Sequence, residues 1–457
     1  MSAIEVRSSS KFISEKKYVF DFVFEILNID WNFIEIDGDH ETELYLNEKC
    51  IFRCTNDFWI RAESEWLKTS LIPTNFNNFP VPTDLNLGEK YLPVFFGKCY
   101  YHSKYEPLPS FNLGFDFFGT IFFLLTGYEE RIQNYKGERF SFSQSILNKF
   151  NLIERPLVDE YIWFLGAILK RAGLFPLKSS DNHSLSVSCD VDNPFAKNLS
   201  AFNLMANTVA SCLRAGELSD FKNWFYSYGS PDFLRDPYVL GTIKIMDANE
   251  RAGNCVTFNF IPYMTSEKKD GKICLSDSKL DLLIKLIVDR GHKIGIHPGF
   301  LSYDSDHFMS RSFKSFNDYF RKYVNEEVGL TGRQHYLNWN YSKTDRLLCK
   351  YQLHEDSTLG FAESIGFRCG TSHRFKIYDY EFRCSLDLYE QPLIVMEDSL
   401  ISKRYMGLGY SEEAYNRVQG CFAKCKKFGG KMTLLWHNCH LGSKTDIEFY
   451  SALLAIK

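Results

Sequence analysis

Short apolar segments alternate with amphipathic helices along the second half of this chain, and this alternation limits the possible folds more than any other sequence feature. Segments of strand character are "SLSVSC", "CVTFNFIP" and "HKIGIHP", followed later by "GFRCGT", "QPLIVME" and "KMTLLWHN". A helix is predicted at residues 238–251, and "DSKLDLLIKLIVDRG" has an apolar face formed by Leu280, Leu283, Ile284 and Ile287. Strand–helix–strand order is typical of a parallel sheet covered by helices, which predicts an α/β fold.

The N-terminal part of the chain is organised differently. Residues 15–28 have helical periodicity, "WNFIEI" and "TELYLN" are typical of short strands, and two further helices are predicted over about 113–130 and 157–173. A chain of 457 residues is also longer than one ordinary domain. We therefore expect an N-terminal α+β accessory domain over residues 1–180 and a second domain over residues 181–457.

Composition and charge argue against a nucleic-acid-binding function and against a membrane span. The formal net charge is -4 and no block of basic residues is present, so no nucleic-acid partner is expected. The longest apolar segment, residues 113–127, contains Asp116 and is too short for a bilayer span, so we expect a buried helix and no membrane span. The N-terminus lacks the features of a secretory signal and the 13 cysteines are scattered, which favours a reduced, cytoplasmic protein.

Polar side chains follow several of the predicted strands. The residues concerned are Asp190, Asp192, His297, Arg368, Arg374, His437 and His440. In parallel sheets, chemistry gathers on the loops that follow the carboxyl ends of the strands. We therefore expect these side chains to line a single site.

Asp190 and Asp192 end one predicted strand only one residue apart. Two carboxylates this close repel each other, which raises the pKa of one of them unless a cation lies beside them. A divalent metal ion resolves the conflict if one aspartate binds it while the other acts as general base on a water molecule. His297 is a candidate ligand; zinc is the expected metal, with cobalt, manganese or nickel as alternatives. A competing interpretation is that the two acids cap a turn before Pro194.

The order of these motifs resembles that of the polysaccharide deacetylases, the NodB-like enzymes of carbohydrate esterase family 4. "SCDVDNP" loosely matches the family's Thr-Phe-Asp-Asp-Gly motif, and "GHKIGIHPG", "GRQHY" and "LLWHN" resemble its later motifs. The resemblance implies a distorted (β/α) barrel that carries a metal-dependent deacetylase. The implied roles are Asp190 as general base, Asp192 and His297 as metal ligands, Arg333 as the partner of the base, Tyr336 beside the oxyanion and His437 as general acid.

One position departs from the family pattern. A second histidine usually follows the first after four residues, and here Leu301 stands at that position. His335 takes the place of the proline in the family's Arg-x-Pro-Tyr motif, so it is our candidate for the third metal ligand, with His307 as an alternative. A loop histidine that only forms hydrogen bonds is the competing interpretation of His335.

Other residues near these motifs have both a functional and a structural interpretation. Asp356 either orients His437 and so sets its tautomer, or caps a loop. Arg368 and Arg374 either bind a phosphate or carboxylate of the substrate, or form ordinary ion pairs. Trp436 either stacks on a sugar or lies in the core.

Two further parts of the chain are interpreted without a catalytic role. Glu397 and Asp398 follow the segment "QPLIVM" and either line the cleft or, the interpretation we favour, are solvated loop acids. Residues 1–180 contain no catalytic constellation, so a function in substrate recognition or in oligomer formation is only a hypothesis. The oligomeric state is left open.

A closer resemblance is to deacetylase-like proteins that have a dedicated N-terminal domain and are encoded with surface-polysaccharide biosynthesis enzymes, such as those of O-antigen. "FDFFGTIFFLLTGYEER" and "YQLHEDSTLGFAESIGFRCGTSHRF" carry this resemblance. It leads us to expect a metal-dependent N-deacetylase whose substrate is an acetamido sugar or a nucleotide sugar. The alternatives are a carbohydrate-binding protein without activity, and a hydrolase of a different amide or of an ester.

Overall fold

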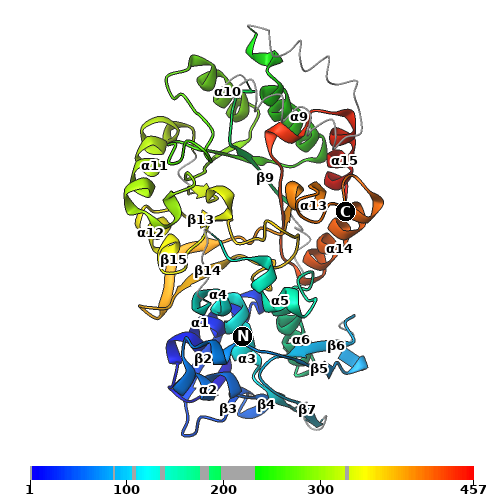
Figure 1. Cartoon of the computed structure of the whole chain (residues 1–457). Helices are drawn as coiled ribbons and strands as arrows, with labels where there is room; N and C mark the ends of the chain where they lie inside the picture. Colours follow the sequence, from blue (N-terminus) through cyan, green and yellow to red (C-terminus); the bar gives the residue numbers. More distant parts are fainter. Residues whose placement is uncertain are drawn as a thin grey trace. The chain divides into compact units, whose positions relative to one another are not determined.

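The chain forms two compact units, shown in Figure 1. The computed structural model describes residues 3–85, 88–104, 110–133, 139–174, 185–196, 232–324 and 329–456. The N-terminal unit consists of Met1–Asn182, Cys369–Leu386 and Lys427–Gly429, and the C-terminal unit consists of His183–Arg368, Asp387–Lys426 and Gly430–Lys457. The predicted domain boundary, between residues 180 and 181, lies outside the described residues.

The N-terminal unit is built on a mixed six-stranded sheet with the order β2-β1-β3-β4-β8-β7. Its strands are β1 (Ile4–Ser8), β2 (Trp31–Glu35), β3 (Glu41–Leu46), β4 (Lys49–Thr55), β7 (Gly97–Lys104) and β8 (Ser110–Phe115). A separate two-stranded sheet is formed by β5 (Asn77–Pro80) and β6 (Tyr91–Val94). The helices are α1 (Ile13–Leu27), α2 (Asp57–Glu65), α3 (Phe117–Leu125), α4 (Tyr128–Ile132), α5 (Ile146–Lys149) and α6 (Leu157–Arg171).

The structure confirms the elements predicted as α1, β2, β3 and α6, but the helix predicted over residues 113–130 is wrong at its start. The first residues of that segment belong to strand β8, and α3 begins only after Asp116, whose carboxylate accepts a hydrogen bond from the backbone N–H of Gly119. All nine residues of α3 are buried. A continuous apolar segment fits a buried strand as well as a buried helix, so periodicity could not separate the two.

The C-terminal unit contains a parallel sheet with the order β15-β13-β12-β11-β10-β9-β17-β16. Its strands are β9 (Leu185–Val191), β10 (Val256–Phe260), β11 (Lys293–Ile296), β12 (Thr331–Gly332), β13 (Glu355–Asp356), β15 (Cys384–Glu390), β16 (Val395–Met396) and β17 (Met432–Leu435). Strand β14 (Phe375–Asp379), which precedes β15 along the chain, belongs to the N-terminal unit. Among the described residues no strand pairing joins β15 to β16, so the barrel is interrupted there.

Helices surround these strands in Figure 1. They are α9 (Pro237–Ala252), α10 (Ser278–Asp289), α11 (Asp306–Tyr319), α12 (Thr344–Lys350), α13 (Glu397–Ile401), α14 (Glu412–Phe428) and α15 (Lys444–Leu454). Parallel strands enclosed by helices confirm the predicted α/β fold, a distorted (β/α) barrel accompanied by the α+β unit. No helix in the described part of the chain combines the length and the apolar character needed to cross a membrane.

Local sequence explains most of these elements. Helix α10 begins where the Asp277 carboxylate accepts a hydrogen bond from the backbone of Lys279, and its four predicted apolar residues are buried. The strand predicted for "GFRCGT" is wrong, because Gly366 and Gly370 have φ angles of 135° and 68°, a backbone conformation that a strand does not contain. Of "QPLIVME", only Val395–Met396 forms a strand.

The carboxyl ends of the parallel strands define one edge of the C-terminal unit. Several candidate residues directly follow a strand end: Asp192 follows β9, His297 follows β11, Arg333 follows β12, Glu397 follows β16 and Trp436 follows β17. Parallel strands point in the same direction, so their carboxyl ends meet at the same edge of the sheet. The side chains of the candidate site come from this edge.

Candidate metal centre

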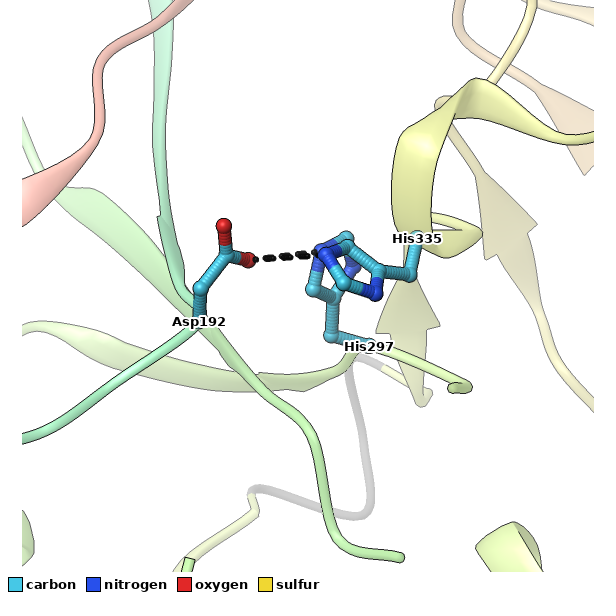
Figure 2. Close-up of side chains that lie close together, drawn as sticks. All are labelled: Asp192, His297 and His335. Atoms are coloured by element: carbon cyan, nitrogen blue, oxygen red, sulfur yellow. Dashed lines mark ion pairs between the residues drawn. The ribbon is translucent and has the colours of Figure 1, made fainter. Parts of the chain in front are cut away.

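Asp192, His297 and His335 converge at the carboxyl edge of the sheet. The Nε2 atoms of His297 and His335 each lie 3.4 Å from Oδ1 of Asp192. One donor atom from each residue lies within 4.8 Å of the other two. Figure 2 shows the Asp192 carboxylate facing the two imidazoles, whose ring centroids are 4.9 Å apart. The structure thus brings together the three residues predicted as ligands, and exposed His307 is not among them.

Two of these donor atoms are buried without a hydrogen-bond partner, namely Oδ1 of Asp192 and Nε2 of His297. Leaving a buried polar atom unsatisfied costs about 1–3 kcal/mol, so a ligand for both atoms is expected. Two imidazole nitrogens and one carboxylate oxygen are donors that zinc and neighbouring divalent metals accept. The donor set and the two unsatisfied atoms therefore fit a divalent cation.

Both imidazoles are held through Nδ1, the ring nitrogen on the far side from Asp192. Nδ1 of His297 lies 2.5 Å from the carbonyl oxygen of Arg333, and Nδ1 of His335 lies 2.7 Å from Oδ1 of Asp270. In each case Nδ1 donates to an oxygen, so Nε2 is the ring nitrogen that faces Asp192. This is the arrangement by which proteins orient histidines toward metals.

Asp270 is a residue that the sequence did not single out. Its Oδ2 accepts hydrogen bonds from the backbone N–H of Thr265, the Thr265 hydroxyl and the backbone N–H of Ser266, while its Oδ1 accepts from Phe300 N–H. Burial opposes ionisation, but the interactions with His335 and the hydrogen bonds from Thr265 and Phe300 together outweigh it, and the pKa of Asp270 falls to about 2. Asp270 lies 65 positions before His335, in a loop without periodicity, so no local signal links the two.

Asp190 lies directly beside the three-residue cluster. Its Oδ1 accepts hydrogen bonds from Nη1 of Arg333 at 3.0 Å and from Nδ2 of Asn259 at 2.8 Å. Its Oδ2 lies 3.8 Å from Nε2 of His297. Burial alone would raise the pKa of Asp190, but Arg333, the histidines and the hydrogen bond from Asn259 together outweigh it and leave the pKa below its ordinary value. Asp190 is therefore a buried, ionised carboxylate within reach of the cluster.

Arg333 is held rigidly behind this carboxylate. Its Nε donates to the carbonyl of Ser357 at 2.7 Å, Nη2 donates to the Ser357 hydroxyl at 3.0 Å, and Nη1 also donates to the hydroxyl of Ser188 at 2.8 Å. The side chain is almost fully buried. Several hydrogen bonds in a planar fork leave the guanidinium one orientation, so it fixes the position of Asp190.

Glu397, His437 and His440 form a second cluster. Oε1 of Glu397 accepts from Nδ1 of His437 at 2.5 Å, from its backbone N–H at 2.8 Å and from Nδ1 of His440 at 2.9 Å. Burial would lower the pKa of His437, but Glu397 outweighs it and raises that pKa well above its ordinary value. Asp190 and Asp192 also raise the pKa of His437, so this imidazole lies near the first cluster.

The structure corrects two interpretations of acidic residues. Glu397 is buried rather than solvated, because its carboxylate is enclosed by the two histidines. Asp356 does not contact His437; its carboxylate accepts from the backbone N–H and the hydroxyl of Thr358, both at 2.9 Å. Asp356 is instead paired with Glu390, its neighbour in register on β15, and burial raises the pKa of both acids. The carboxylate that orients His437 is Glu397.

Two predicted substrate-binding residues are buried in the core. Trp436 is fully buried, packs against Tyr450 with ring centroids 4.8 Å apart and donates from its indole N–H to the carbonyl of His440. Arg368 is only 5% exposed and donates to the carbonyl of Gly360 at 2.8 Å. Their burial and these contacts favour the structural interpretation of Trp436 and Arg368 over the substrate-binding one.

The two other predicted substrate-binding residues are exposed. Tyr336 is 40% exposed, and its ring centroid lies 4.6 Å from that of His335. Its φ of 61° is rare for a residue other than glycine and lies in the turn that also carries His335. Arg374 is exposed and belongs to the N-terminal unit, so its contact with a substrate stays a prediction.

Comparisons with known proteins give one family and several distant structures. Residues 4–174 match the model of a family of unknown function, DUF7033. No curated protein matches the chain. A solved structure from Mycobacterium smegmatis, provisionally described as a polysaccharide deacetylase, is 17% identical, with 62% of this chain and 88% of that chain covered and a TM-score of 0.38. Puue allantoinase is 10% identical, with 58% and 81% covered and a TM-score of 0.36.

Proposed function

We propose that the C-terminal unit is a metal-dependent N-deacetylase that hydrolyses the acetamido group of a sugar in surface-polysaccharide or nucleotide-sugar biosynthesis. The observation that carries this proposal is the position of Asp190. It is an ionised carboxylate held by Arg333 and Asn259, with Oδ2 3.8 Å from a nitrogen of the Asp192–His297–His335 cluster. The resemblance of the sequence motifs to the polysaccharide deacetylases supports the same reaction.

Asp190 acts as the general base. A divalent metal bound by the cluster would polarise the amide carbonyl and lower the pKa of a water molecule. Asp190 accepts a proton from the water that attacks the carbonyl carbon. Its lowered pKa keeps it ionised and ready for this proton, and Arg333 keeps it in position while the water adds.

His437 acts as the general acid. Its Nδ1–H is donated to Glu397, so the protonated ring presents Nε2–H for donation. The raised pKa of His437 keeps the ring protonated before the reaction. As the C–N bond breaks, His437 gives this proton to the departing nitrogen, and the products are acetate and the free amino sugar.

The experiment that tests this proposal is acetate release from a panel of N-acetylated sugars and nucleotide sugars. The Asp190→Asn variant keeps the size of the side chain and removes its basicity, so its rate should fall by about 10²–10⁴-fold. Exposed Asp304 offers the matched control, and Asp304→Asn should have the wild-type rate. Wild-type acetate release by Asp190→Asn would refute the role of Asp190.

The geometry bears on one alternative function, a binding protein without activity, and does not separate the other, a hydrolase of a different bond. A carbohydrate-binding protein without activity was suggested by the missing histidine at Leu301, and His335 offers a third nitrogen donor in its place. A hydrolase of another amide, or of an ester, would use the same residues. The substrate panel separates this possibility from sugar deacetylation, because only the scissile bond differs.

A further inference from the structure

The open side of the candidate metal centre is formed by an aromatic side chain. The exposed ring of Tyr336 packs edge-on against Phe300, with centroids 5.2 Å apart, and contacts His335 on its other side. A sugar held at the cluster therefore extends past Tyr336.

Lys269 lies over this aromatic surface. Its Nζ is 5.0 Å from the ring centroid of Tyr336 and 5.3 Å from that of Phe300, within the range of a cation–π contact. The next residue along the chain is Asp270, which holds His335. Lys269 therefore lies next to the residue that orients the third predicted ligand, and its own side chain is exposed.

Arg404 approaches Tyr336 from a different part of the chain. Its guanidinium lies over the ring of Tyr405 at 5.4 Å, and Tyr405 packs against Leu337, the residue that follows Tyr336. Tyr405 packs on a core cluster formed by Leu337, Ala362, Leu393, Met396 and Leu435. Met396 and Leu435 end strands β16 and β17, so Arg404 belongs to the same carboxyl edge as the candidate site.

Neither cation has a carboxylate partner within the described residues, in contrast to Arg290 and Arg383, which pair with Glu250 and Glu15. Two exposed cations on this side of the candidate site would both attract an anion bound there. Phosphate and carboxylate groups are the anions that lysine and arginine bind in this way.

We propose that Lys269 and Arg404 form an anion-binding rim beside Tyr336, and that the substrate is an acetamido sugar that carries a phosphate, diphosphate or carboxylate group. This inference rests on the proposed function, because it names the substrate class of the same site. It assigns to these two residues the anion contact that the sequence had suggested for Arg368 and Arg374, of which Arg368 is buried.

The test compares the binding of three sugars to the metal-loaded full chain by titration calorimetry. The sugars are neutral N-acetylglucosamine, N-acetylglucosamine 1-phosphate and N-acetylmuramic acid, which carries a carboxylate. At least one anionic sugar should bind about tenfold more tightly than the neutral one, since it gains two exposed ion pairs. The anionic sugar that binds more tightly identifies the substrate class. Its advantage in affinity over the neutral sugar should shrink as salt concentration rises.

A double variant, Lys269→Ala with Arg404→Ala, should bind all three sugars with the affinity of the neutral one. Lys268→Ala with Lys403→Ala is the matched control, because these exposed lysines are the adjacent residues and the charge change is the same. The control should keep the preference of the wild type. Unchanged metal content in both double variants verifies that the site is intact.

Equal affinity of the wild type for the three sugars would overturn the inference, and so would a failure to bind any of them. An equal loss of preference in the test and control variants would overturn it as well, because the loss would then come from the change in overall charge and not from these two residues. The proposed function has a separate failure, wild-type acetate release by Asp190→Asn, which leaves the binding preference untouched. The two failures are therefore distinguishable.

Discussion

Two clusters of one carboxylate and two histidines lie at the same sheet edge, yet their atoms are arranged differently. In the first, Asp192 faces two Nε2 atoms at 3.4 Å each, which is too long for a good hydrogen bond. In the second, Oε1 of Glu397 accepts hydrogen bonds from two Nδ1 atoms at 2.5 and 2.9 Å. A carboxylate and two histidines thus leave room between their donor atoms in the first cluster, whereas in the second cluster they are joined by hydrogen bonds.

This difference indicates that the ring nitrogen facing the acid decides whether such a cluster suits a metal ion or proton transfer. In the first cluster Nδ1 is bound from behind, by Arg333 or Asp270, so the free Nε2 atoms suit a cation. In the second, the protons lie between the histidines and Glu397, so the cluster suits proton transfer. We interpret the first as a metal site and the second as the acid of the reaction.

The largest expected effect is loss of bound metal when a residue of the first cluster is removed. Asp192→Ala, His297→Ala and His335→Ala each delete one donor, so near-stoichiometric metal in the wild type should fall to background in elemental analysis. Glu397→Gln, in the second cluster, should keep its metal. If Glu397→Gln lost metal while His335→Ala kept it, the assignment of the two clusters would be reversed.

A smaller effect is expected from Asp270→Asn, which keeps a side-chain oxygen near Nδ1 of His335 but removes the charge. Loss of such an orienting partner typically weakens metal binding by about 10–100-fold. Competition with a chelator measures the affinity. Asp247→Asn, at an acid paired with Arg290 away from the site, is the control. Equal affinity of Asp270→Asn and the wild type would mean that Asp270 does not orient His335 for a metal.

Glu397→Gln should shift the pH profile of deacetylation rather than the metal content. Glu397 raises the pKa of His437, while burial lowers it, so without this charge the pKa of His437 falls. The general acid must be protonated, so the fall in rate on the alkaline side should move to lower pH by about one unit or more. An alkaline limb that stays in place would show that His437 is not the group that titrates.

The smallest effect is expected from His440→Gln. His440 donates to Glu397 but is one step removed from the proposed acid, and His437 keeps both of its own contacts with that carboxylate. The deacetylation rate should fall by less than about tenfold, less than for a group that transfers the proton itself. A loss of rate as large as that of His437→Ala would make His440 a catalytic residue and would change the roles assigned within the second cluster.

The sequence was sufficient to predict part of the group that gathers at the sheet edge. Asp192 and His297 each directly follow a predicted strand, and parallel strands end at the same edge, so their proximity follows from position along the chain. Arg333 came from the motif resemblance, because the short strand before it was not predicted. His335 as the third donor came from the order of the motifs, and its contact with Asp192 agrees with that role. These inferences need only local pattern and strand direction.

Other features depended on residues far apart in the chain. Asp270 reaches His335 across 65 positions, and Glu397, not Asp356, contacts His437. The sequence left two interpretations of Trp436 open, and packing against Tyr450 shows that it lies in the core. Such contacts depend on how separate loops and helices pack, which the spacing of residues within one segment does not contain.

By itself, then, the sequence determined the α/β class, the strands whose ends carry polar side chains and the kinds of donor at the site. The tertiary structure alone decided which imidazole nitrogen faces which acid, since each ring is oriented by a partner from another loop. It also decided which charges stay exposed, leaving Lys269 and Arg404 beside Tyr336 while Arg368 is buried. The physical reason is that orientation and burial are properties of neighbours in space, and those neighbours come together only when the chain folds.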